Sequence, residues 1–135
     1  MNKPAPARAD GLLAALTPQN CRRAAIAFFV AMILIGSIPG EAEALNAMIY
    51  DKLSHFVAYS LLSGFVYHAF QGSPLRRALL TLASVGLFGA TDEVVQSLLS
   101  YRQSSVLDWQ VDMLAACVTV TVLWSIRAAR VASGK

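Results

Sequence analysis

Four stretches without a single Asp, Glu, Lys or Arg constrain the fold of this chain more than any other feature. They cover residues 24–40, 53–74, 78–91 and 113–126. A helix needs about 20 residues to cross about 30 Å of hydrocarbon, so the second stretch can span a membrane alone and the first nearly so. The third is long enough if it continues through Asp92 and Glu93 to about Leu99, and the fourth if it starts near Val106. The pattern predicts four transmembrane helices.

The composition supports a membrane protein of the all-α class. Apolar residues make up 56% of the chain and charged residues only 14%. Soluble domains have about 45–50% apolar and about 25% charged residues, so this chain has too few charges to solvate its own surface. A disordered chain, a coiled coil or a nucleic-acid-binding protein would each need more charge. We therefore expect a polytopic bundle of four helices that binds no nucleic acid.

Turn-forming residues separate the apolar stretches and define one domain. Pro39-Gly40 follows the first stretch, Gly72-Ser73-Pro74 follows the second, and a polar turn over residues 100–105 precedes the fourth. We expect a cytoplasmic tail over residues 1–20, a four-helix membrane domain over 21–127 and a second cytoplasmic tail over 128–135.

The distribution of basic residues predicts the orientation. Threading four helices places Lys52 and Arg102 on one side of the membrane and all other bases on the opposite side, namely Lys3, Arg8, Arg22, Arg23, Arg76, Arg77, Arg127, Arg130 and Lys135. By the positive-inside rule both termini are cytoplasmic, which predicts a multi-pass membrane protein with its first and third loops on the outer side. An alternative stays open, because Ala42-Glu43-Ala44 looks like the cleavage site of a signal peptide.

The polar residues of the apolar segments cluster near the predicted outer ends. Asp51, His55 and Tyr59 repeat at every fourth position and therefore share one helix face. The next two helices bring further polar groups to the same depth. The expected ligand-binding set is Asp51, Lys52, His55, Tyr59, Asp92, Glu93, Gln96, Arg102, Asp108 and Asp112.

Embedded carboxylates have to be neutralised or paired. An Asp at the centre of a membrane helix costs about 2.5–3.5 kcal/mol on the insertion scale, so these acids should face one another and Arg102 rather than lipid. Asp51, His55, Glu93 and Asp108 offer oxygen and nitrogen atoms suited to Mg²⁺, Mn²⁺ or Zn²⁺. We expect a polar pocket at the outer end of the bundle and no cofactor other than such a cation.

Three ordered motifs resemble the VanZ-like family of small membrane proteins. They are Asp51-Lys52-Leu53-Ser54-His55-Phe56 with Tyr59, then Asp92-Glu93-Val94-Val95-Gln96, then Arg102 with Ser104, Ser105 and Asp108. The resemblance covers residues 51–124 and implies a hydrophobic multi-helix architecture and a multi-pass location in the bacterial cytoplasmic membrane. One member is associated with low-level resistance to the glycopeptide teicoplanin, and the family has no established reaction. The chain departs from the family pattern at Asp112, where Asn is usual, and at Ala115, near a usual Gly.

The pocket and the resemblance together favour a binding function. The leading hypothesis is an outward pocket for a membrane lipid headgroup, a lipid-linked envelope component or a glycopeptide. A metal-dependent membrane enzyme acting on a lipid-linked substrate is one alternative, although the chain has no H-E-x-x-H, G-x-S-x-G or P-loop motif. A small ion or proton-coupled transporter is the other, because embedded acids and His can relay protons.

Overall fold

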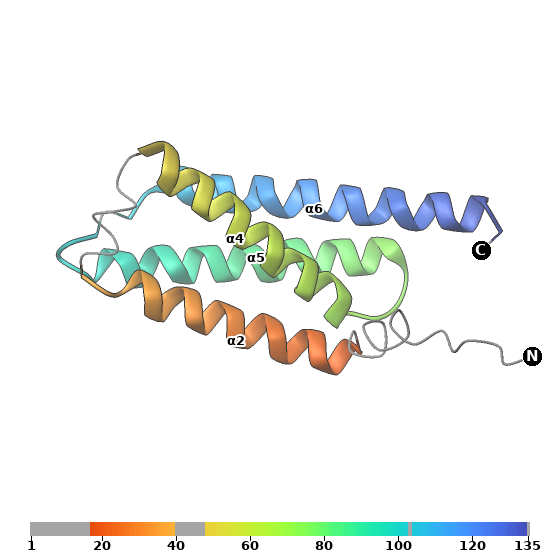
Figure 1. The fold of residues 1–135 in the computed structure, drawn as a ribbon, viewed down its shortest axis with the longest axis horizontal. Helices are drawn as coiled ribbons and strands as arrows, with labels where there is room; N and C mark the ends of the chain where they lie inside the picture. Colours follow the sequence, from red (N-terminus) through yellow and green to blue (C-terminus); the bar gives the residue numbers. More distant parts are fainter. Residues whose placement is uncertain (1–16, 40–47, 103, 135) are drawn as a thin grey trace, which may run out of the picture.

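The computed structural model describes residues 17–39, 48–102 and 104–134, and the secondary structure in these ranges is entirely helical (Figure 1). The helices are α2 (Pro18–Gly36), α4 (Met48–Ala69), α5 (Pro74–Ser97) and α6 (Val106–Ala132). The predicted all-helical architecture is confirmed. The possible cleavage site at residues 42–44 and the tail before residue 17 lie outside the described residues.

The helix boundaries follow from local sequence signals. Thr17 and Ser73 cap α2 and α5, since their side-chain oxygens accept hydrogen bonds from backbone N–H groups three residues later. Each cap is followed by a proline, whose fixed φ suits the first helical position. Gly72 turns the chain between α4 and α5 with a φ of 108°, which a residue with a side chain rarely adopts. The turn expected at Gly72-Ser73-Pro74 is confirmed.

The third and fourth apolar segments extend through their acids, as the sequence predicts. α5 continues past Asp92 and Glu93 to Ser97, and α6 begins at Val106, before Asp108. At the two ends of the predicted membrane domain the helices extend further than expected. α2 starts at its cap before residue 21, and α6 continues beyond residue 127 through Ala and Arg residues, which are strong helix formers.

Three helices are long and apolar enough to cross a membrane, namely Pro18–Gly36, Pro74–Ser97 and Val106–Arg130. Large apolar side chains on them point away from the bundle, including Leu34, Leu87 and Leu114, each more than half exposed. Such surfaces suit lipid rather than water. By length and composition the chain is therefore a multi-pass membrane protein. α4, with 22 residues, is long enough to span as well, but it is not one of these three, and its first turn carries Asp51 and Lys52.

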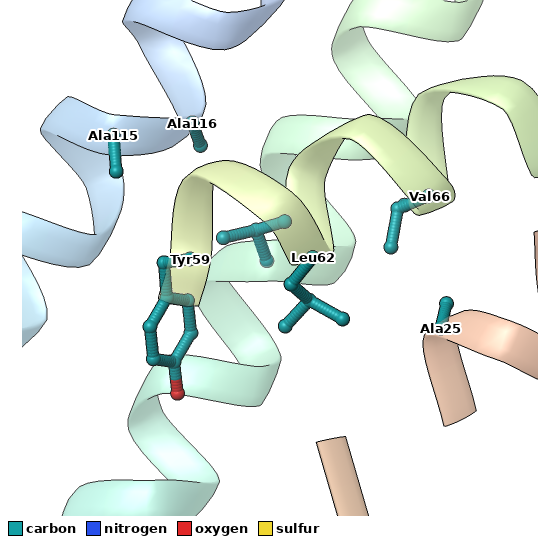
Figure 2. Packing of buried hydrophobic residues seen from close by; sticks show 7 residues of the cluster. Ala25, Tyr59, Leu62, Val66, Ala115 and Ala116 are labelled. Atoms are coloured by element: carbon teal, nitrogen blue, oxygen red, sulfur yellow. The ribbon is translucent and has the colours of Figure 1, made fainter. Parts of the chain in front are cut away.

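α4 is the central helix of the bundle. It packs against α2, α5 and α6, whereas α2 touches α5 only slightly. Figure 1 shows α2 and α6 at opposite edges of the bundle with α4 crossing between them. Tyr59, Leu62 and Val66 of α4 form the middle of the core, where small residues of the neighbouring helices let the backbones approach (Figure 2). These small residues are Ala25, Ala115 and Ala116. The other three helices thus surround α4.

Candidate ligand-binding site

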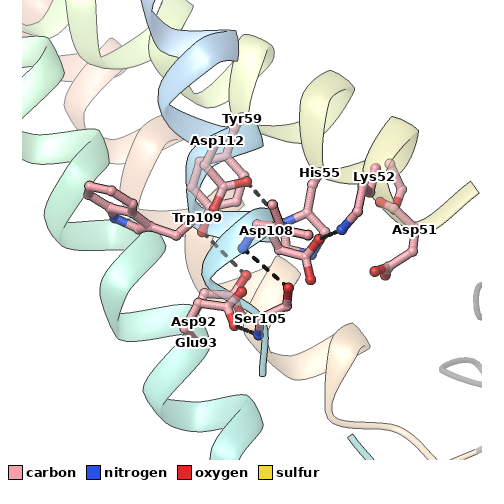
Figure 3. A network of polar contacts seen from close by, with 12 residues as sticks. Asp51, Lys52, His55, Tyr59, Asp92, Glu93, Ser105, Asp108, Trp109 and Asp112 are labelled. Atoms are coloured by element: carbon pink, nitrogen blue, oxygen red, sulfur yellow. Dashed lines mark hydrogen bonds and ion pairs between the residues drawn. The ribbon is translucent and has the colours of Figure 1, made fainter. Parts of the chain in front are cut away.

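Polar side chains from α4, α5 and α6 meet at one end of the bundle (Figure 3). We call the six linked residues the polar cluster: Lys52, His55, Tyr59, Asp92, Asp108 and Asp112. Five of them are buried, and Lys52 is partly buried. The structure thus brings these six residues together from three helices, as the sequence predicts, at one end of the bundle.

One ion pair and one histidine–carboxylate contact join α4 to α6 within the polar cluster. Lys52 Nζ donates to Asp108 Oδ1, and His55 Nδ1 lies 2.9 Å from Asp112 Oδ1. The pairs match because the two donors stand three residues apart on α4 and the two acids stand four apart on α6, so both sets span one helical turn. A protonated His55 would make the second pair ionic.

A third contact joins α4 to α5. The Tyr59 hydroxyl donates to Asp92 Oδ2 over 3.2 Å, and Tyr59 itself is fully buried. The imidazole of His55 lies parallel to the Tyr59 ring, with the ring centroids 6.0 Å apart. The face that carries His55 and Tyr59 at spacing i, i+4 therefore contacts acids from two different helices. The predicted polar stripe on this helix is confirmed for these two residues.

Glu93 has a different role from the one its position suggested. Its Oε2 accepts a hydrogen bond of 2.6 Å from the backbone N–H of Ser105, just before α6 begins. Ser105 in turn accepts from the backbone N–H of Leu107 through its hydroxyl. Glu93 also lines a separate recess with Ser104 and Trp109. A carboxylate is a strong acceptor for unpaired helix N-termini, so Glu93 fixes the start of α6. The sequence signal for this was the Ser104-Ser105 pair.

Gly89 allows α6 to approach α5 at the polar cluster. A Cβ atom on Gly89 would lie 2.9 Å from Asp112 Oδ2 and 3.0 Å from Trp109 Cδ1. The Trp109 indole N–H also donates to the backbone carbonyl of Gly86 over 3.0 Å, one turn earlier on α5. Only a residue without a side chain leaves room for the buried carboxylate at this position.

A cavity of about 320 Å³ lies beside the polar cluster, between α2, α4 and α5. We call it the α2 cavity. One wall is apolar and comes from α2, with Phe28, Met32 and Ile35. The opposite wall is polar and consists of Asp51, Ser54, His55, Asp92, Gln96 and Arg102. The contribution of α2 was not predicted, because its apolar residues look like those of any membrane helix.

Arg102 lies in the wall of the α2 cavity without a partner among the described residues. Its buried Nε atom has no hydrogen bond, and neither ion pair of the described chain includes its guanidinium group. The expectation that Arg102 neutralises the acids is wrong for residues 17–39, 48–102 and 104–134. Lys52 does this instead, because it lies on α4, which packs directly against the acids of α6.

The predicted metal ligands come together only in part. Asp51, His55 and Asp108 each offer one ligand atom, and these atoms all lie within 4.8 Å of one another. Glu93, the fourth candidate, is bonded to Ser105 and is not part of this group. Because Asp112 holds His55 through Nδ1, the other ring nitrogen is available to a ligand.

Comparison with known proteins gives one informative match. No family model and no solved structure matches the chain. An uncharacterized protein of Schizosaccharomyces pombe is 33% identical over 100 residues, which is 73% of this chain and 62% of that protein. The chain thus spans less than two thirds of the length of that relative. The VanZ-like resemblance stays a prediction, and a bacterial membrane finds no support in a fungal relative.

The close approach at Gly89 generates a stability prediction. Gly89→Ala should destabilise the protein by about 1–3 kcal/mol, because the added methyl group overpacks against Asp112 and Trp109. Gly64→Ala is the matched control, since a Cβ there meets nothing within 4 Å and alanine is the better helix former. Unfolding by SDS in mixed micelles measures both variants. Equal stability of the two would contradict the close approach.

Proposed function

We propose that this protein is a four-span membrane protein that binds the headgroup of an amphiphilic ligand in the α2 cavity. The ligand is a membrane lipid or a lipid-linked component of the cell envelope. One observation carries the proposal: the guanidinium of Arg102 lines a cavity with one apolar and one polar wall, and no described residue pairs with it. Arg102 is partly exposed, but its buried Nε–H donor has no acceptor, which is costly, so a ligand that supplies an anion would stabilise it.

The two walls of the α2 cavity suit the two parts of an amphiphile. Phe28, Met32 and Ile35 can contact an acyl chain, and the opposite polar wall can contact a headgroup. Ligand sites commonly have volumes of about 300–1,000 Å³, and this cavity lies at the lower end of that range. The forked donors of Arg102 match a phosphate or a carboxylate.

The orientation of the protein is part of this proposal. With both termini cytoplasmic, the α2 cavity faces the outer side of the membrane. The resemblance to the VanZ-like family supports an envelope ligand there, and a glycopeptide is the ligand class that the resemblance suggests. Tolerance to teicoplanin would follow in a bacterial membrane, whereas a lipid headgroup would suit a membrane of any organism.

A second candidate function is that of a metal-dependent enzyme acting on a lipid-linked substrate. The grouping of Asp51, His55 and Asp108 favours it, since two carboxylates and an imidazole suit Zn²⁺ or Mn²⁺. Asp112 would act as the outer carboxylate that orients the ligating histidine. A metal here would supply a Lewis acid beside the α2 cavity.

Binding of lipid tests the proposed function. Arg102→Gln should reduce the phospholipid that co-purifies with the protein by about tenfold, the effect of losing one charge-assisted hydrogen bond. Quantitative lipid mass spectrometry of the purified protein measures it. Arg130→Gln is the matched control, because Arg130 is exposed in the last turn of α6, far from the cavity. Equal lipid content in both variants would refute a headgroup site at Arg102.

Reporter fusions test the orientation. A reporter that is active only in the cytoplasm should work when fused after Gly72 or after Lys135 and should fail after Ala44. The reason is the excess of bases around residues 72–77 and at both termini. Activity at the Ala44 fusion would reverse the orientation.

Metal titration tests the second candidate. Zn²⁺ added to chelator-treated protein should bind with a stoichiometry near one. Asp108→Asn should weaken Zn²⁺ binding by about tenfold or more, because losing even a residue that only supports a metal ligand lowers affinity by this factor. Lys52→Gln should instead strengthen Zn²⁺ binding, because it frees Asp108 from its present partner. Calorimetry of the three proteins measures the affinities. Weaker binding by Lys52→Gln would argue against a site at Asp108.

A further inference from the structure

The charges on the polar wall of the α2 cavity restrict the kind of headgroup that fits. Arg102 is the only Arg or Lys among the described residues that line it, His55 is held by Asp112, and Asp51 and Asp92 are its acids. Asp92 accepts the hydrogen bond from Tyr59. Asp51 differs, because no described residue forms a side-chain hydrogen bond or an ion pair with its carboxylate. The wall thus presents one guanidinium and one carboxylate that no described side chain bonds, beside Asp92, whose partner is a neutral hydroxyl that supplies no opposite charge.

The two free charges do not neutralise each other within the described structure. Ion pairs there reach from Lys52 and His55 to α6, and none joins Arg102 to Asp51. A ligand with a single negative charge would satisfy Arg102 but would be repelled by Asp51. A ligand with a single positive charge would pair with Asp51 but would be repelled by Arg102. A headgroup that carries both signs satisfies both side chains at once.

The position of the two charges fits a lipid that lies along α2. Asp51 is in the first turn of α4, and Arg102 follows the end of α5, so both stand at the end of the bundle where headgroups of a bilayer would lie. On α2, Ile35 is near the same end, and Phe28 lies seven residues deeper, about 10 Å at 1.5 Å per residue. The apolar wall therefore runs from headgroup level towards the middle of the membrane.

We infer that the α2 cavity selects a zwitterionic phospholipid with a primary amine, of the phosphoethanolamine type, with the phosphate at Arg102 and the ammonium group at Asp51. This inference rests on the proposed function and names its ligand class. A primary ammonium group has three N–H donors for a carboxylate, whereas the quaternary ammonium of choline has none. A glycerol headgroup has no positive charge for Asp51. The order of affinity is therefore ethanolamine first, then choline and glycerol.

Short-chain lipids test this selectivity on the purified full-length protein. Dihexanoyl phosphatidylethanolamine should bind about tenfold more tightly than the phosphatidylglycerol or phosphatidylcholine of the same chain length, the difference expected from one charge-assisted hydrogen bond. Native mass spectrometry in a non-ionic detergent measures the three dissociation constants. A wild-type protein that binds all three equally would overturn the inference without any variant.

A variant of Asp51 tests whether this residue binds the ammonium group of the headgroup. Asp51→Asn should lower the preference for phosphatidylethanolamine over phosphatidylglycerol from about tenfold to about one, while phosphatidylglycerol binds as well or better. Glu93→Gln is the matched control: it also removes a carboxylate at this end of the bundle, but Glu93 lies outside the α2 cavity and Gln can still accept from Ser105. If Glu93→Gln also loses the preference for phosphatidylethanolamine, the preference depends on the total negative charge at this end of the bundle. That result would overturn the specific role of Asp51.

Arg102→Gln separates this inference from the function on which it rests. It should weaken binding of all three lipids, because each carries a phosphate. If it weakens none of them, the proposed headgroup site fails. If it weakens all three but Asp51→Asn keeps the preference, the headgroup site stands and the zwitterion inference fails. A preference that disappears when a chelator is added would assign Asp51 to a metal ion and would also overturn the inference.

Discussion

The structure depends on how a mostly apolar bundle accommodates buried carboxylates. Asp92, Asp108 and Asp112 are each at most 8% exposed, in a chain whose outer surface suits lipid. Each has a partner on α4: the Tyr59 hydroxyl, the Lys52 amine and the His55 imidazole. Removing one partner would leave a buried carboxylate without its hydrogen bond, which is destabilising, so these contacts hold α4, α5 and α6 in one register.

The central position of α4 follows from the same constraint. A helix that carries Asp51, Lys52 and His55 in its first turns would be costly to expose to hydrocarbon. Packing it among α2, α5 and α6 hides its polar face and lets the apolar surfaces of the others face outward. A glycine at position 89 is then needed, because the buried carboxylate of Asp112 on α6 lies so close to the backbone of α5 that a side chain at this position would collide with it.

The sequence predicted the helices and the grouping of the polar residues, because both depend on local spacing. Charge-poor stretches and turn residues located the four helices, and the i, i+4 repeats located the acids and their depth. Which polar side chain bonds to which depends on the helix faces that pack together. Those faces cannot be predicted from the spacing of residues in a single sequence. Lys52 therefore pairs with Asp108 where Arg102 was expected, and Glu93 caps α6 where a ligand role was expected. The part that α2 plays in the cavity could not be predicted, since its apolar residues resemble those of any lipid-facing helix.

The pairing of Lys52 with Asp108 has a consequence for the α2 cavity. Because α4 supplies the cation that the acids of α6 need, Arg102 is not used in holding the bundle together within the described chain. α2 packs chiefly on α4 and only slightly on α5, so the wall opposite Arg102 is held from one side. The same arrangement thus leaves the Arg102 guanidinium, the Asp51 carboxylate and one apolar helix face around a cavity. A lipid with a charged head and an apolar chain is complementary to all three.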